Sequence, residues 1–187
     1  MFKEEIDNAL KILKKGGIIL YPTDTVWGIG CDATNFEAVK KIYKLKQRHD
    51  SKAMICLVNN LGMLERHVDN VPNIAYNILE LAVKPTSIIY DEPAGVAENL
   101  IGPDNTLAIR VTQDEFCQKL IRYLGKPIVS TSANISGKPT AKSYEEIPEE
   151  VLKGVDYIVN LHHEKKASTP STIIKLSNDG KVQIIRE

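Results

Sequence analysis

Apolar positions along the chain follow two spacings, one typical of helices and one of short buried strands. Apolar residues at helical spacing predict helices over residues 2–15, 35–47, 61–67, 73–82, 115–124 and 145–152. Compact apolar runs predict strands over residues 17–22, 53–58, 86–92, 106–111, 127–133, 157–161, 171–176 and 181–186. Asn35 is a suitable N-cap for the second helix. Strands and helices interleave without a strict β-α-β rhythm, which predicts an α/β fold of α+β-like character: a mixed sheet with flanking helices.

Length and charge place the chain among ordinary globular domains. Its 187 residues suit a single domain spanning 1–187, and 24 basic residues balance 24 acidic ones. That balance argues against a protein held on nucleic acid by bulk charge. The cysteines are odd in number and far apart, which argues against a disulfide framework and a structural zinc site. The N-terminus does not resemble a signal peptide and no apolar run reaches about 20 residues, so a cytoplasmic protein without membrane contact is expected.

A polar motif, PTDTVWGIG, directly follows the first predicted strand. Hydroxyls such as that of Thr25, together with a carboxylate, stand where open α/β sheets usually bind ligands. A polar turn with two glycines has the same composition, so spacing alone leaves both interpretations open. No GxxxxGK[ST] sequence occurs, so any use of ATP does not involve a P-loop.

A basic cluster follows the second predicted helix. Lys40, Lys41 and Lys44 are expected on its solvated face. Lys46, Arg48 and Lys52 lie beyond it, and an extended backbone would point Lys46 and Arg48 the same way. Because converging cations repel one another, this cluster predicts a site for a phosphate or carboxylate.

A second polar segment, STSANISG, ends another apolar strand and is compatible with either a ligand-binding loop or a plain strand-to-loop transition. Arg110, within the apolar run TLAIRV, is more informative. An arginine in a buried strand needs an anionic partner, either an internal carboxylate or a ligand.

Taken in order, these segments resemble the YrdC family. PTDTVWGIG is similar to the family's opening PT[DE]TVYGLG, and KQRHDSK to its KxR signature with a following basic residue. TLAIRV, STSANISGKPT and PSTIIKL resemble its arginine-bearing strand, its SANxSG loop and its ST-bearing strand. The resemblance runs from about residue 7 to Arg186. It departs at Trp27, where the family usually has tyrosine, and at Ala53, where a proline is usual.

The resemblance implies a fold and a set of site residues. The expected fold is a single YrdC-like domain with a twisted sheet and a large open cavity. L-Threonine would be held by Thr25, Arg110, Ser132 and Ser171. The expected catalytic cations, facing the phosphates of ATP, are Lys46, Arg48 and Lys52. Residues expected around the nucleotide are Arg48, Lys52, Thr106, Asn134 and Arg186.

The activity implied by the resemblance is synthesis of threonylcarbamoyl-AMP from L-threonine, bicarbonate and ATP, with release of pyrophosphate. This nucleotidyltransferase reaction serves the threonylcarbamoyladenosine modification of tRNA. It implies Mg²⁺ alongside ATP, and proteins of tRNA modification, or tRNA itself, as partners. Two alternatives stay open. One is a module that binds structured RNA in the same cavity. The other is the related carbamoyl transfer of hydrogenase-maturation enzymes, whose acylphosphatase-like and zinc-finger regions have no counterpart in this sequence.

Overall fold

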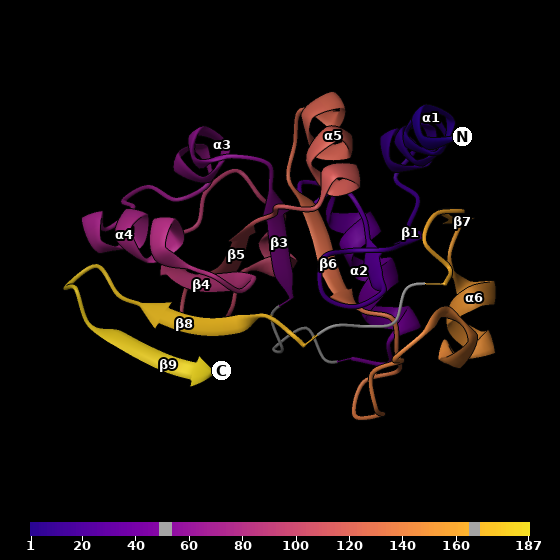
Figure 1. Cartoon of the computed structure of the whole chain (residues 1–187). Helices are drawn as coiled ribbons and strands as arrows, with labels where there is room; N and C mark the ends of the chain where they lie inside the picture. The colour runs from indigo at the N-terminus through magenta and orange to yellow at the C-terminus, as the bar shows by residue number, and fades with distance from the viewer. Residues whose placement is uncertain (49–53, 165–168) are drawn as a thin grey trace.

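The computed structural model describes residues 1–48, 54–164 and 169–187 (Figure 1). Its helices are α1 (Phe2–Lys14), α2 (Phe36–Leu45), α3 (Leu61–Arg66), α4 (Asn73–Leu81), α5 (Glu115–Leu124) and α6 (Glu149–Gly154), with the short 3-10 turns η1 (Glu98–Leu100) and η2 (Tyr144–Glu146). Its strands are β1 (Ile19–Tyr21), β2 (Gly28–Gly30), β3 (Ile55–Val58), β4 (Thr86–Asp91), β5 (Thr106–Val111), β6 (Ile128–Ser132), β7 (Tyr157–Ile158), β8 (Thr172–Leu176) and β9 (Val182–Arg186).

One mixed sheet organises the molecule. In the described residues its nine strands run in the order β7-β1-β2-β6-β3-β5-β4-β8-β9. The pairs β1/β7, β3/β5 and β4/β8 are parallel, whereas β1/β2, β2/β6, β3/β6, β4/β5 and β8/β9 are antiparallel. The mixed sheet with flanking helices that the sequence predicts is therefore confirmed. This order brings motifs distant in sequence, on β2, β5, β6 and β8, into one sheet.

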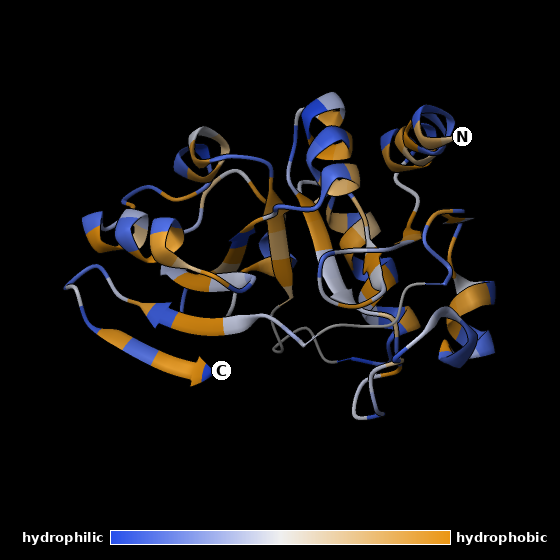
Figure 2. Cartoon of the chain, in the orientation of Figure 1, coloured by the Kyte–Doolittle hydropathy of each residue, from blue (hydrophilic) through white to orange (hydrophobic). Residues whose placement is uncertain are grey.

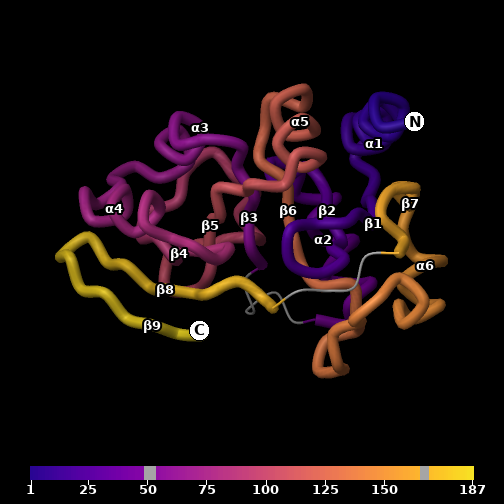
Figure 3. Tube along the Cα trace, viewed as in Figure 1, coloured from indigo at the N-terminus to yellow at the C-terminus, as the bar shows by residue number. Residues whose placement is uncertain are grey.

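Amphipathic helices cover the sheet with their apolar faces. Helix α5 buries Phe116, Cys117, Leu120 and Ile121, and α1 packs beside it, as the tube view also shows (Figure 3). The hydropathy colouring shows apolar and polar residues on different sides of α5 (Figure 2). Such stripes are what the helical spacing predicts, because residues three and four apart share a face.

Helix α2 begins where the sequence predicts. The side chain of Asn35 accepts a hydrogen bond from the Ala38 amide, which confirms it as the N-cap. The three lysines predicted on the solvated face of this helix, Lys40, Lys41 and Lys44, are exposed.

Two elements differ from the prediction. Strand β2 lies inside the segment interpreted only as a polar turn or ligand site, because a run of Gly-Ile-Gly carries no alternating pattern. At Gly30 a Cβ would lie 2.5 Å from the Val129 carbonyl oxygen, so this strand needs a residue without a side chain. The helix expected over 145–152 instead spans Glu149–Gly154. Pro148 precedes it in an extended conformation, with η2 as a separate turn before it.

The three cysteines, Cys31, Cys56 and Cys117, are buried and free, as expected. Across residues 1–48, 54–164 and 169–187, no helix has the length and apolar character needed to cross a membrane.

Candidate active site

A cavity of about 350 Å³ is lined by the turn before β2, by the sheet from β2 across to β4, and by the β8–β9 hairpin. Its volume lies in the range of small-molecule sites. Of the residues predicted for the site, those that line it are Thr25, Arg48, Thr106, Arg110, Ser132, Ser171 and Arg186. Lys46 and Asn134 are not among the lining residues. Lys52 lies outside the residues that the structure describes.

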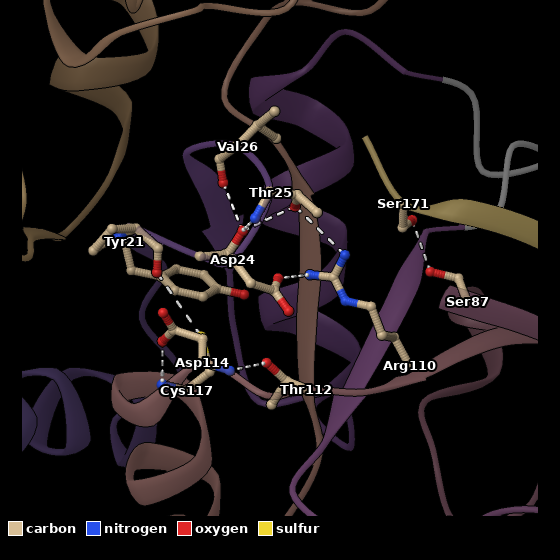
Figure 4. A network of polar contacts seen from close by, with 12 residues as sticks. Tyr21, Asp24, Thr25, Val26, Ser87, Arg110, Thr112, Asp114, Cys117 and Ser171 are labelled. Carbon is tan, nitrogen blue, oxygen red and sulfur yellow. Dashed lines mark hydrogen bonds and ion pairs between the residues drawn. The ribbon is translucent and has the colours of Figure 1, made fainter. Parts of the chain in front are cut away.

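Arg110 forms the buried centre of this arrangement. Its side chain is 4% exposed, and Nη2 lies 3.0 Å from Oδ1 of Asp24. Its Nη1 donates a hydrogen bond of 3.4 Å to Oγ1 of Thr25 (Figure 4). The anionic partner that a buried arginine requires is therefore the carboxylate of Asp24, which the sequence analysis noted in its motif without singling it out as a site residue.

The turn after β1 presents Thr25 to the cavity through a local hydrogen-bond network. Oγ1 of Thr23 donates to the Val26 carbonyl at 2.8 Å and accepts from the Thr25 amide at 3.1 Å. The hydroxyls of Thr23 and Thr25 lie 3.0 Å apart. Because Thr23 is buried, these bonds hold the turn in one conformation, and Figure 4 shows Asp24 and Thr25 both facing the guanidinium of Arg110.

Lys46 lies behind the cavity wall. It is 1% exposed, and its Nζ donates to the carbonyl oxygens of Ser132, at 2.5 Å, and Asn134, at 2.7 Å. A third bond of 3.2 Å reaches Oδ1 of Asn134. Burial, followed by the neighbouring charge of Arg48, lowers the pKa of Lys46 to about 8. Lys46 therefore ties the end of α2 to the loop that follows β6.

Lys46 and Arg48 would point the same way only on an extended backbone, and the backbone between them is not extended. Lys46 ends α2 in a helical conformation, and Gln47 follows with φ of 50°. This left-handed residue turns the chain so that Arg48 reaches the cavity.

Ser171 connects β4, β8 and β9. Its Oγ lies 2.9 Å from Oγ of buried Ser87 (Figure 4). Nε and Nη2 of Arg186 donate to its carbonyl oxygen at 3.1 and 2.8 Å. Burial, followed by the charge of Arg110, lowers the pKa of Arg186. The guanidinium groups of Arg110 and Arg186 thus lie close enough to repel, which favours an anionic ligand between them.

Two further features of the cavity were not predicted. The first is an apolar wall, formed by Met54, Ile55, Ile89, Ala108, Ile173 and Ile185. These side chains carry no charge or hydroxyl group, so nothing in the sequence distinguishes them from ordinary strand residues. The second concerns Thr106, whose Oγ1 donates its proton to Asp104 at 2.7 Å, so this hydroxyl is left to accept a hydrogen bond from a ligand.

Trp27, at a departure from the family pattern, packs outside the cavity lining. It is 3% exposed, and its ring lies 5.2 Å from that of Tyr144 and 5.4 Å from that of His163. The rings of Tyr144 and His163 stack at 4.0 Å. The larger indole is accommodated by this aromatic cluster instead of by the cavity floor.

The arrangement defines a class of site: a polar, cationic cavity over a mixed sheet, with an apolar wall. A family model for Sua5, YciO and YrdC proteins, described as "Telomere recombination", matches residues 11–187, and the chain belongs to this family.

Three known proteins illustrate the similarity. The threonylcarbamoyl-AMP synthase of Pseudoalteromonas translucida (strain TAC 125) is 35% identical over 179 residues, covering 93% of this chain and 94% of that protein. The crystal structure of P. abyssi Sua5 complexed with L-threonine is similar at 28% identity with a TM-score of 0.81. The similarity covers 91% of this chain and 50% of that one, so this chain spans about half of Sua5. The crystal structure of E. coli YciO has 28% identity and a TM-score of 0.84, and 97% of this chain covers 88% of it.

Proposed function

We propose that this chain synthesises threonylcarbamoyl-AMP from L-threonine, bicarbonate and ATP, releasing pyrophosphate. The observation that carries the proposal is one cavity that combines a buried arginine beside hydroxyl groups with two further guanidinium groups and an apolar wall. The 35% identity to a protein named threonylcarbamoyl-AMP synthase supports this activity, which is a nucleotidyl transfer.

In this proposal the end of the cavity around Arg110 takes the amino acid. The guanidinium binds the carboxylate of threonine, and the hydroxyls of Thr25 and Ser171 contribute hydrogen bonds. The P. abyssi Sua5 structure, which is complexed with L-threonine, supports an amino-acid site in this fold. Ser132, which also lines the cavity, completes the polar set.

The remaining cavity takes ATP. Arg48 faces the phosphates, and Arg186 and Thr106 lie near the nucleotide. The part expected of Lys52 stays a prediction from the sequence, because it falls outside the described residues. The apolar wall offers a surface for the adenine base, since ligand sites usually pair apolar walls with few polar groups. Mg²⁺ enters as part of the ATP substrate, held by phosphate oxygens and water. No group of three or more His, Cys, Asp or Glu residues suited to a metal occurs in the described ranges.

The chemistry needs no protein nucleophile. The amine of threonine attacks the carbon of bicarbonate, and water leaves to give a carbamate. A carbamate oxygen then attacks the α-phosphorus of ATP, and pyrophosphate departs with the electrons of the broken P–O bond. The work of the protein is to orient the substrates, stabilise the developing negative charge and keep water from the carbamate.

Lys46 and Asn134 take a supporting role. Because Nζ of Lys46 is occupied by the carbonyl oxygens of Ser132 and Asn134, it holds the backbone that carries Ser132 at the cavity instead of reaching the phosphates. The product would pass to proteins that modify tRNA in the cytoplasm, which stays a prediction from the sequence resemblance.

Purified protein tests the proposal. Pyrophosphate release from MgATP is measured with L-threonine and bicarbonate together and with each omitted. We expect release only when both are present. Pyrophosphate release that does not require threonine would reject the synthase activity. So would the absence of release from folded protein that binds ATP.

A further inference from the structure

The ion pair between Asp24 and Arg110 is buried and specific. The two side chains are 17% and 4% exposed, and the charged atoms lie 3.0 Å apart. The turn that carries Asp24 is held by the Thr23 hydrogen bonds, so the carboxylate has little freedom to leave. The positive charge of Arg110 is therefore matched by a fixed negative charge before any ligand arrives.

The two partners face different spaces. Arg110 lines the main cavity, whereas Asp24 lines a separate groove of about 540 Å³ between α4 and the end of β5. Thr86, Val111 and Gln113 lie along the same groove. Asp24 thus lies behind Arg110 as seen from the cavity. It acts on a ligand in the cavity by holding the guanidinium in place and through the electrostatic field of its own carboxylate.

The end of the cavity around Arg186 has no such fixed carboxylate paired with its arginine in the described residues. Arg186 donates to the neutral carbonyl of Ser171, and within the described residues it forms no salt bridge. Its charge can be offset by a simple anion, such as a phosphate. At Arg110 a simple anion would also be exposed to the field of the Asp24 carboxylate behind the guanidinium, and like charges repel.

We propose that Asp24 is a positioning residue that makes the Arg110 end of the cavity selective for zwitterionic amino acids over simple carboxylates. The proposal rests on the function proposed above, in which Arg110 binds the carboxylate of threonine. An amino acid brings an ammonium group next to its carboxylate, so the repulsion between Asp24 and the ligand carboxylate is offset by an attraction between Asp24 and the ammonium group. A ligand without the amine gains the attraction to Arg110 but not the attraction to Asp24. The same fixed pair disfavours phosphates of ATP at this end.

Binding of two ligands to three proteins tests the proposal. The ligands are L-threonine and 3-hydroxybutyrate, which is threonine without its amine, and binding is measured by calorimetry without turnover. For wild type we expect threonine to bind more tightly by on the order of tenfold or more, the size expected for unit charges several ångströms apart at an intermediate dielectric. Asp24→Asn keeps the shape and removes the charge, so this preference should fall toward equality. Asp24→Glu restores the charge and should restore the preference.

Asp7→Asn provides the matched control, because Asp7 is exposed on α1 and the substitution removes the same charge. It should leave the preference unchanged. An Asp24→Asn variant that folds, as judged by its thermal transition, and keeps the wild-type preference would overturn the proposal. So would equal binding of both ligands by wild type, a result that needs no variant. If wild type does not bind threonine at all, the proposed amino-acid site is wrong, and the proposal for Asp24 is wrong with it.

Discussion

Replacing Lys46 by methionine distinguishes a lysine that anchors a loop from one that binds phosphate. Methionine keeps most of the side-chain volume but removes the ammonium group, whose three hydrogen bonds hold the loop after β6. A lysine that only contacted phosphates would leave the free protein as stable as before, or more stable, since its repulsion with Arg48 disappears. An anchoring lysine predicts the opposite sign.

The magnitude follows from two opposing contributions. Hydrogen bonds to a charged group contribute about 1.5–3 kcal/mol each. Burial of the cation, together with its repulsion by Arg48, costs about 3 kcal/mol, because the pKa of Lys46 falls from 10.5 to about 8 and each unit corresponds to about 1.4 kcal/mol. We therefore expect Lys46→Met to lower the free energy of unfolding by about 1.5–6 kcal/mol.

Thermal and urea unfolding of the free protein measure this change. For a chain of this size the expected loss corresponds to a fall in Tm of about 3–24 °C. Lys40→Met is the matched control, because Lys40 is exposed on the same helix, and it should change stability by less than about 0.5 kcal/mol. If Lys46→Met is as stable as the control, the anchoring role is wrong and a direct role with the phosphates regains support.

Three further predictions concern the cavity, the core and the sheet. Arg48→Ala should lower kcat for pyrophosphate release by a factor of about 10²–10³ with an unchanged Tm, as expected for a lost donor to developing charge, and near-normal turnover would contradict its role. Burial raises the pKa of Cys56 to about 12, so its contribution to stability is complete below about pH 9 and is lost as the pH rises toward 12. Relative to Cys56→Ala, the wild type should thus lose about 1 kcal/mol of unfolding free energy between pH 8 and pH 10, and a constant difference would refute this burial effect. Gly30→Ala should destabilise the fold by about 1–3 kcal/mol, because its Cβ would meet the Val129 carbonyl at 2.5 Å, and urea unfolding that matches wild type would exclude this clash.

Features determined by local chemistry were predictable from the sequence. The N-cap at Asn35, the stripe of α5 and the lysines exposed on α2 follow from side-chain spacing alone. A buried arginine also predicts an anionic partner, because burying a charge without a partner costs too much free energy. Which carboxylate partners Arg110 depends on the pairing of distant strands, and no pattern along the chain selects Asp24.

The features that sequence analysis missed depend on backbone geometry or on tertiary packing. The positive φ of Gln47 sends Lys46 and Arg48 in different directions, whereas a repeating extended pattern would have aligned them. Strand β2 is defined by pairing with β1 and β6, not by its composition. The residues of the apolar wall have the sequence pattern of ordinary strand core. That they line a cavity depends on how the β8–β9 hairpin packs at the edge of the sheet, which the sequence pattern does not show.

Isotope incorporation tests the central claim most directly. The protein is incubated with MgATP, L-threonine and ¹³C-bicarbonate, and the products are separated and weighed by mass spectrometry. The account predicts an adduct of the mass of threonylcarbamoyl-AMP that carries the label from bicarbonate and forms only with all three substrates. Active, folded protein that yields pyrophosphate without this labelled adduct would contradict it.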